Sequence, residues 1–234
     1  MSWKILVVED EKLMLEMAQT TLEIAGHSVV TCDSGADAVQ VFQDSKPDVV
    51  ILDWMLPGKD GLEILQELVS ISSTPVIMAS AKTEVEDVER ALDFGADDYI
   101  KKPYGGKELI RTITAVMNVP ERSDNTVVKI GPLTIDVSAY EVSRGSKQIL
   151  LTPLEFNLLL TIAEDPKHTF TREELLKKVW LHKNLNDEGD FKGKIDTRLV
   201  NVHIQRLRSK IEENPDDPQI VTTVRGRGYK AGAN

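Results

Sequence analysis

The first half of the chain alternates short apolar runs with amphipathic stretches, and no other feature restricts its fold as much. The runs are rich in β-branched residues and too short for helices, which predicts strands at Ile5–Val8, Val29–Thr31, Val49–Leu52, Val76–Ala79 and Tyr99–Lys101. The periodicity of the other stretches predicts helices at Glu11–Ala25, Gly35–Phe42, Leu62–Ile71, Glu84–Phe94 and Lys107–Met117. Strands that alternate with helices pair in parallel, so we expect a doubly wound α/β domain with a five-stranded parallel sheet.

A change of pattern near the middle of the chain predicts a second domain. Residues 119–126 are polar, contain Pro120 and show no periodicity, as expected of a linker. At 234 residues the chain is long enough for two modest domains, which we place at 1–118 and 127–234. The second begins with strand-like segments and continues with helices; the segments are Val127–Ile130, Leu133–Val137, Tyr140–Ser143 and Gln148–Leu151.

Helix-start signals and a closing hairpin complete the second domain. Two segments place a threonine three residues before a glutamate, the pattern of a capping box: Thr152 with Glu155, and Thr171 with Glu174. A third helix is predicted over Thr197–Glu212, and prolines follow it. Ile220–Val224 and Gly228–Lys230 then predict a hairpin. The second domain is therefore expected to be smaller and of the α+β class.

Charge is distributed unevenly between the two halves. Residues 1–118 contain 10 Lys and Arg against 21 Asp and Glu, whereas residues 119–234 contain 18 against 17. The acidic excess of the first half suits a domain that binds cations rather than polyanions. Within the balanced second half, Thr197–Lys210 carries four basic side chains and no carboxylate, which indicates a nucleic-acid face.

The sequence carries no pattern of export or of membrane insertion. Its longest apolar runs fall far short of the ~20 residues that span a bilayer, and its first residues lack a signal-peptide pattern. The one cysteine, Cys32, cannot form an internal disulfide. We therefore expect a cytoplasmic protein with no membrane partner.

Charged and hydroxyl side chains follow the predicted strands of the first domain at their carboxyl ends. In an open parallel sheet these ends meet at one edge, where ligands bind. Carboxylate oxygens gathered there suit Mg²⁺, because a cation relieves their repulsion. A lysine and a hydroxyl at the same edge suit phosphoryl transfer onto an aspartate. The side chains concerned are Glu9, Asp10, Asp53, Ser80 and Lys102.

These segments resemble the receiver domain of two-component response regulators, which has a flavodoxin-like fold. The resemblance covers about 118 residues and rests on five motifs in order: Val7-Val8-Glu9-Asp10, Leu52-Asp53-Trp54-Met55-Leu56-Pro57-Gly58, Ala79-Ser80-Ala81, Gly95-Ala96-Asp97-Asp98-Tyr99 and Lys102-Pro103. It implies that Asp53 is the phosphoacceptor for a sensor histidine kinase. It also implies an Mg²⁺ site formed by Glu9, Asp10, Asp53 and the Met55 carbonyl.

The resemblance implies three further roles in the first domain. Ser80 and Tyr99 correspond to the switch pair of the family, which responds to the phosphoryl group. Lys102 corresponds to the lysine that binds that group, and a cis peptide is expected before Pro103. Taken alone, Ser80 would more often cap a helix, and an ordinary core role is open for Tyr99.

The predicted helix at Thr197–Glu212 separates apolar from polar side chains. Leu199, Val200, Leu207 and either His203 or Ile204 recur at helical spacing and can form a buried stripe. The other faces carry Arg, Asn and Gln, which can pair with guanine and adenine in a major groove. The hairpin arginines, Arg225 and Arg227, suit phosphates or a narrow minor groove. A merely solvated basic face is the alternative for such a helix.

Residues 127–232 resemble the winged-helix output domain of the OmpR/PhoB subfamily. Four motifs carry the resemblance: Leu151-Thr152-Pro153-Leu154-Glu155-Phe156, Arg172-Glu173-Glu174-Leu175-Leu176, Val202-His203-Ile204-Gln205-Arg206-Leu207-Arg208 and Val224-Arg225-Gly226-Arg227-Gly228-Tyr229. They imply a recognition helix at Arg198–Glu212, double-stranded promoter DNA as ligand and RNA polymerase as partner. The side chains implied at DNA are Arg198, Val202, His203, Arg206, Arg208, Arg225 and Arg227, with a buried role equally open for His203.

Two features depart from the pattern of the family. Activated receivers of this subfamily usually form homodimers through basic residues, but the matching positions here are Val88, Thr112 and Asn118. We therefore expect the usual dimer to be weakened or replaced. The segment Leu181–Ile195 is longer than the family's loop at this place, where RNA polymerase is contacted. The longer segment either alters the contact with RNA polymerase or is a surface insertion without a role, which loops tolerate at little cost in stability.

The sequence thus predicts a transcription factor, not an enzyme, whose DNA binding is controlled by phosphorylation of Asp53. A regulator that binds DNA equally well without phosphorylation remains an alternative, because the basic residues of the usual receiver dimer interface are missing. A Mg²⁺-dependent phosphatase with Asp53 as nucleophile is a weaker alternative, since Trp54 and Met55 supply no general acid. A receiver that acts only through protein partners leaves Arg206 and Arg208 unexplained.

Overall fold

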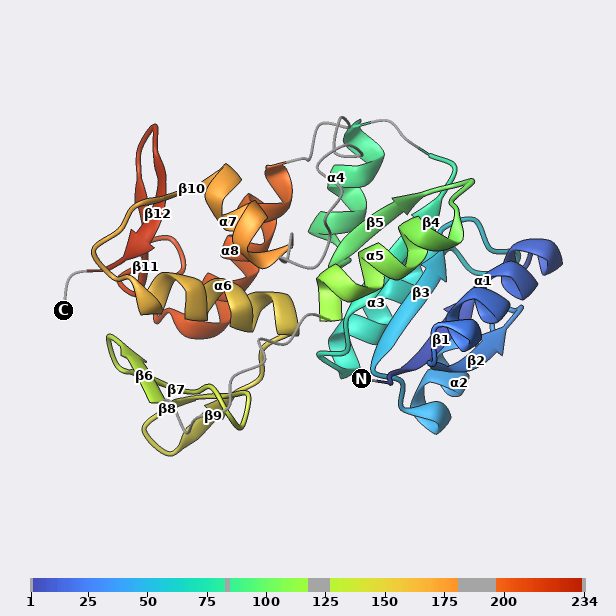
Figure 1. The fold of residues 1–234 in the computed structure, drawn as a ribbon, viewed down its shortest axis with the longest axis horizontal. Helices are drawn as coiled ribbons and strands as arrows, with labels where there is room; N and C mark the ends of the chain where they lie inside the picture. The colour runs from blue at the N-terminus through green and yellow to red at the C-terminus, as the bar shows by residue number, and fades with distance from the viewer. Residues whose placement is uncertain (1, 83–84, 118–126, 181–196, 233–234) are drawn as a thin grey trace. The chain divides into compact units, whose positions relative to one another are not determined.

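The computed structural model describes residues 2–82, 85–117, 127–180 and 197–232. The chain divides into two compact units, Met1–Met117 and Asn118–Asn234, and each has its own core (Figure 1). The predicted linker at 119–126 and the long segment at 181–195 lie outside the described residues. None of the described helices is long and apolar enough to cross a membrane.

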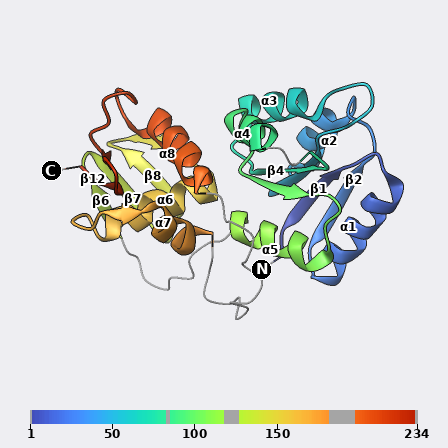
Figure 2. The ribbon, with the colours of Figure 1, turned by 90° about the horizontal axis from the view of Figure 1, so that it is seen from above.

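The first unit is built on a parallel sheet of five strands in the order β2-β1-β3-β4-β5. The strands are β1 (Lys4–Val8), β2 (Ser28–Cys32), β3 (Val49–Asp53), β4 (Val76–Ser80) and β5 (Asp98–Lys101). The helices are α1 (Lys12–Ile24), α2 (Ala38–Ser45), α3 (Gly61–Ile71), α4 (Val85–Asp93) and α5 (Gly106–Met117). Helices α1 and α5 cover one face of the sheet, and α2, α3 and α4 cover the other (Figure 2). The predicted doubly wound fold is confirmed.

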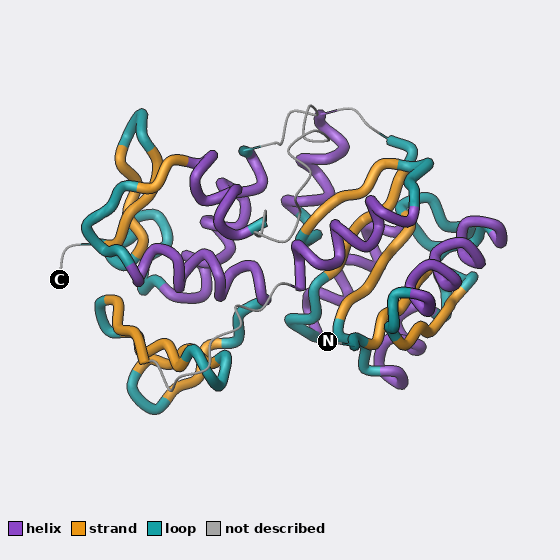
Figure 3. The backbone as a smooth tube through the Cα atoms, viewed as in Figure 1, coloured by secondary structure: helices purple, strands orange, loops and turns teal. Residues whose placement is uncertain are grey.

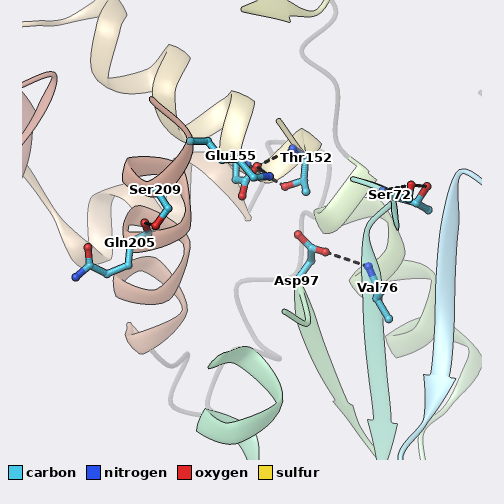
Figure 4. A network of polar contacts seen from close by, with 9 residues as sticks. Ser72, Val76, Asp97, Thr152, Glu155, Gln205 and Ser209 are labelled. Carbon is cyan, nitrogen blue, oxygen red and sulfur yellow. Dashed lines mark hydrogen bonds and ion pairs between the residues drawn. The ribbon is translucent and has the colours of Figure 1, made fainter. Parts of the chain in front are cut away.

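Burial explains why the central strands read as unbroken apolar runs. Every residue of β3 and of β4 is buried, because helices cover both faces of the sheet. Each buried Val, Leu or Ile contributes about 1.5–3 kcal/mol relative to exposure. The register next to β4 is secured by Asp97, whose carboxylate accepts a hydrogen bond from the Val76 amide at 3.0 Å (Figure 4).

The loop after β3 must pass very close to the strand end. A Cβ at Gly61 would clash with the carbonyl oxygen of Asp53, so only glycine fits at the start of α3. The Gly61 amide also donates to the Trp54 carbonyl at 2.9 Å. These contacts fix the backbone that carries Asp53. At the end of β5, the expected cis peptide between Lys102 and Pro103 is present.

The second unit combines two antiparallel sheets with three described helices (Figure 3). The first sheet has the order β6-β7-β8-β9 and the second the order β10-β12-β11. The first contains β6 (Val127–Ile130), β7 (Leu133–Asp136), β8 (Glu141–Arg144) and β9 (Lys147–Ile149). The helices and the remaining strands are α6 (Pro153–Glu164), β10 (Phe170–Thr171), α7 (Arg172–Val179), α8 (Arg198–Ile211), β11 (Val221–Val224) and β12 (Gly228–Ala231).

Both predicted capping boxes are present, at the starts of α6 and α7. Figure 4 shows the first, in which the Thr152 amide donates to the Glu155 carboxylate at 2.8 Å. Several bounds of the predicted elements differ by one to three residues, and two differences have a clear physical reason. Helix α2 begins at Ala38, because residues 35–37 form a turn, and the strand β10 was not expected. A strand of two residues is too short to show a period of its own.

Candidate functional site

Three carboxylates converge at the carboxyl edge of the first sheet. Glu9 follows β1, Asp10 begins the next loop, and Asp53 ends β3, which pairs directly with β1. One oxygen from each side chain lies within 4.8 Å of the others. Glu9 and Asp53 are buried, whereas Asp10 is exposed. The predicted acidic cluster is therefore assembled, with one side open to solvent.

Lys102 reaches this cluster from the end of β5. Its ammonium nitrogen lies 2.5 Å from Glu9 Oε2 and 2.8 Å from Asp53 Oδ2. Burial opposes the charge of Lys102, but the hydrogen bonds to Asp53 and Glu9, together with the negative charges of these two carboxylates, outweigh burial and raise the pKa of Lys102. Burial raises the pKa of Glu9 to about 7, although its hydrogen bond to Lys102 acts in the other direction. Lys102 therefore serves as the internal counter-charge of the two buried carboxylates.

The donor set fits a hard divalent cation. Among the described residues, these three carboxylates form the one group of acidic, histidine or cysteine side chains close enough to share an ion. All their donor atoms are oxygens, which Mg²⁺ prefers. The Met55 amide donates to Asp53 Oδ1 at 3.1 Å, so the loop that carries the Met55 carbonyl is held against Asp53. A groove of about 450 Å³ adjoins the cluster, between Asp10, Lys82 and the loop at 54–60.

Ser80 and Tyr99 meet at the loop that follows β4. Ser80 is fully buried, and its hydroxyl accepts a hydrogen bond from the Lys82 amide at 3.0 Å. The Tyr99 hydroxyl donates to the carbonyl of Lys82 and lies 3.5 Å from the carbonyl of Ser80. Burial raises the pKa of Tyr99. The two predicted switch residues thus contact the same short loop, beside the acidic cluster.

The described part of the second unit separates the predicted DNA-binding residues into two groups. Arg225 and Arg227 are exposed at the turn between β11 and β12, and Arg198, Val202 and Arg206 are partly exposed on α8. His203 and Arg208 are buried, at 0% and 6% exposure. The His203 ring packs edge-on against Trp180, with ring centres 5.4 Å apart. His203 therefore takes the buried role that the sequence left open.

Arg208 holds α8 to strand β11. Its guanidinium donates twice to the Val221 carbonyl, at 2.9 and 2.7 Å, and once to the Thr223 hydroxyl at 2.8 Å. Burial lowers the pKa of Arg208. The prediction that placed this side chain at DNA conflicts with its burial in the isolated chain. The helical spacing could have indicated the burial of Arg208, because this residue lies four positions after the buried Ile204 on the same helix.

A polar network that the sequence did not predict joins α7, α8 and β12. The Asn201 side-chain oxygen accepts hydrogen bonds from Arg172 Nε at 2.6 Å and from the Tyr229 hydroxyl at 2.9 Å. The guanidiniums of Arg172 and Arg208 lie 5.2 and 5.5 Å from the centre of the Tyr229 ring. Asn201 is the asparagine of the predicted recognition helix, and its side-chain oxygen is therefore engaged by two residues of its own domain. The contacts span about 28 residues, beyond the reach of local patterns.

Comparison with known proteins identifies both units. The family model "Response regulator receiver domain" matches residues 5–114, and "Transcriptional regulatory protein, C terminal" matches residues 146–231. The DNA-binding response regulator MtrA of Mycolicibacterium smegmatis is 42% identical over 232 residues, covering 99% of this chain and 98% of the relative. The transcriptional regulatory protein AfsQ1 of Streptomyces coelicolor is 37% identical over 226 residues, covering 97% and 96%.

Two solved structures match with coverage of all or nearly all of the chain. The crystal structure of DrrB, an OmpR/PhoB homologue from Thermotoga maritima, is 30% identical with a TM-score of 0.50 and covers 100% of both chains. A RitR mutant, at 23% identity and a TM-score of 0.69 over 99% of each chain, shares the fold. With both family models, the acidic cluster and full-length relatives in agreement, the chain belongs to the OmpR/PhoB family of DNA-binding two-component response regulators, in which a receiver domain precedes a winged-helix transcription-regulatory domain.

Proposed function

We propose that phosphorylation of Asp53 by a sensor histidine kinase controls the sequence-specific DNA binding of this chain. The observation that carries the proposal is the bridge from Lys102 to Glu9 and Asp53, at 2.5 and 2.8 Å, inside a cluster of three carboxylates. An ammonium and a cation site beside one aspartate supply the positive charge that a transferred phosphoryl group requires.

The transfer itself needs little from the protein beyond position and charge. An oxygen of Asp53 forms a bond to the phosphorus of the kinase phosphohistidine while the P–N bond breaks, and the electron pair leaves with the imidazole, which takes up a proton. Lys102 then binds an oxygen of the new phosphoryl group. Glu9, Asp10, Asp53 and the Met55 carbonyl would hold Mg²⁺, which would supply charge neutralisation there.

Asp10 offers a direct test of the metal site. It is the exposed member of the cluster, so Asp10→Asn is expected to leave the fold intact while removing one anionic ligand. We expect the dissociation constant for Mg²⁺, measured by calorimetric titration of the full chain, to rise about tenfold or more. Asp48→Asn, at the opposite end of β3, is the matched control. Equal affinities for the wild type and Asp10→Asn would contradict the assignment.

The proposed conformational switch acts through the loop after β4, which both Ser80 and Tyr99 contact. A phosphoryl oxygen on Asp53 accepts a hydrogen bond from the Ser80 hydroxyl, whose oxygen already accepts one from the Lys82 amide. This donation is available only in the phosphorylated state. Movement of Ser80 shifts the loop whose carbonyl accepts from Tyr99, and thus the surface near α4 and β5. Differential stabilisation of this kind shifts a population of conformations.

The DNA interface that we propose consists of α8 and the turn between β11 and β12. Arg198, Val202 and Arg206 would face the major groove, and Arg225 and Arg227 the backbone or the minor groove. The test is selection of genomic fragments by the full chain with beryllofluoride and Mg²⁺ at fixed salt. Strong enrichment of a few promoter fragments is expected. Uniform retention of all fragments would show nonspecific binding only.

RNA polymerase is the proposed downstream partner, and homodimers on activation or on DNA are the proposed assembly. Thr112 favours a weakened form of the usual receiver dimer, because its hydroxyl donates to the Glu108 carbonyl of its own helix at 3.0 Å and it is buried. Val88 is uncharged and partly buried, and Asn118 lies outside the described residues.

The strength of this dimer can be measured directly. We expect the full chain with beryllofluoride and Mg²⁺ to remain mainly monomeric at micromolar concentration, because the matching positions provide no interprotomer ion pairs. Light scattering of the treated and the untreated protein gives the mass. Introducing a basic side chain at the partly buried matching position, with Val88→Arg, tests the cause. A tight dimer of the unmodified sequence through the α4–β5–α5 face would refute the expectation.

A further inference from the structure

The side-chain amide of Asn201 is held in one orientation by the network that joins α7, α8 and β12. Its oxygen accepts hydrogen bonds from Arg172 Nε at 2.6 Å and from the Tyr229 hydroxyl at 2.9 Å. A guanidinium can only donate, so the atom that faces Arg172 must be Oδ1 and not Nδ2. Both donors are themselves restrained, because the Arg172 guanidinium lies 5.2 Å from the centre of the Tyr229 ring and Tyr229 is 5% exposed. The orientation of the amide is therefore fixed in the free protein.

The nitrogen of the same amide remains available to a ligand. Nδ2 makes no hydrogen bond to the described residues and is not one of their buried unsatisfied atoms, so its two N–H groups are open to solvent. Asn201 is the fourth residue of α8 and shares a face with the partly exposed Arg198 and the exposed Gln205, three positions before it and four after it. Residues near the N-terminus of a recognition helix are those that reach base edges. The fixed donors thus lie on the part of α8 that suits contact with bases.

We propose that Asn201 contacts DNA only as a hydrogen-bond donor, and that it selects guanine or thymine over cytosine at one base position. In the major groove guanine presents the acceptors N7 and O6 and thymine presents the acceptor O4, whereas cytosine presents the N4 amino group, a donor. Pairing of an asparagine with adenine requires both its nitrogen and its oxygen, and the oxygen of Asn201 is already engaged. Adenine, with one acceptor beside a donor, should rank between the two groups. The inference rests on the proposed function, because it takes α8 as the helix that enters the major groove.

The variant Asn201→Asp separates the donor from the role in the network. Its carboxylate keeps an oxygen for Arg172 and Tyr229, so we expect the domain to unfold at no lower temperature than the wild type. Its outer atom becomes an acceptor, which suits the N4 amino group of cytosine. The full chain, with beryllofluoride and Mg²⁺ at fixed salt, selects from a pool of random-sequence duplexes. Wild-type protein should prefer guanine or thymine over cytosine at one position by about five- to tenfold, as for one hydrogen bond. The preference at that position should reverse in Asn201→Asp.

Two further variants make the result specific to the amide nitrogen. Ser209→Asp is the matched control, because it adds the same charge at an exposed position about two turns further along α8. It should weaken binding to all duplexes and leave every base preference unchanged. Asn201→Ala, which removes the amide altogether, should lose the preference at the same position without gaining one for cytosine.

The outcomes distinguish this inference from the proposed function. If Asn201→Asp selected the same bases as the wild type, with or without a uniform loss of affinity, the inference would be overturned, and Asn201 would be a residue of the network or a contact to DNA phosphates. If the wild type enriched no sequence at all, the proposed DNA interface would be refuted, and the inference with it.

Discussion

Asp53→Ala is expected to abolish covalent phosphorylation of the chain and to leave its fold intact. Asp53 is the buried carboxylate that Lys102 contacts at 2.8 Å and that ends β3 at the open edge of the sheet. The other buried carboxylate, Glu9, already accepts from Lys102 and from the Glu11 amide. Removing Asp53 relieves repulsion within the cluster while Lys102 keeps its contact to Glu9, so no unpaired charge remains.

The measurement is the intact mass of the chain after incubation with a phosphoramidate donor and Mg²⁺. Wild-type protein should gain up to one phosphoryl group, and the variant none. Asp48→Ala is a matched control, because Asp48 precedes the same strand and caps the Lys4 amide at 2.7 Å at the opposite end of the sheet. It should retain full labelling. Stoichiometric labelling of Asp53→Ala would assign the acceptor to another residue.

Arg208→Ala is expected to destabilise the second unit by about 2–4 kcal/mol, the range for loss of a buried, charge-assisted hydrogen-bond set. The variant leaves the Val221 carbonyl without its two guanidinium donors and removes the contact to Thr223. Arg208→Lys should recover only part of the loss, because an ammonium cannot reproduce the planar fork of donors.

Arg225→Ala provides the contrast, since this arginine is exposed at the tip of the β11–β12 turn. We expect its stability to stay within about 0.5 kcal/mol of the wild type. Its DNA affinity should fall, with the slope of log affinity against log salt reduced by about 1. Urea unfolding and DNA titrations at several salt concentrations check both variants. If Arg208→Ala were as stable as the wild type but no longer bound DNA, the Arg208 side chain would instead be assigned to the DNA interface.

The first unit could be predicted closely because its signals are local. Each apolar run is short, and a charged residue that marks the turn follows within three positions of its end. The position of Glu9 and Asp53 at neighbouring strand ends then follows from the geometry of a parallel sheet. The bridge formed by Lys102 depends on β5, which is two strands away from β3 in the sheet order, so its distances came only from the structure.

The second unit shows which features local sequence patterns could not predict. Arg206 and Arg208 differ by two positions on one helix, and both match the family motif. Which of them is buried depends on the Val221 carbonyl, which belongs to a strand thirteen positions further along the chain. The same is true of Asn201, whose oxygen is engaged by Arg172 and Tyr229. Residue type alone does not distinguish a side chain that reads DNA from one that holds the reading helix in place.

Control of DNA binding by phosphorylation of Asp53 can be measured as the affinity for a selected promoter fragment, at fixed salt, with and without beryllofluoride and Mg²⁺. Salt must be held constant because contacts to DNA phosphates dominate the affinity. We expect a clear rise in affinity with the phosphoryl mimic, and no rise in Asp53→Asn, which keeps the shape of the side chain and removes its charge. Equal affinity in both states of the wild-type chain would contradict control by Asp53 and would mean that the winged-helix domain binds DNA unaided.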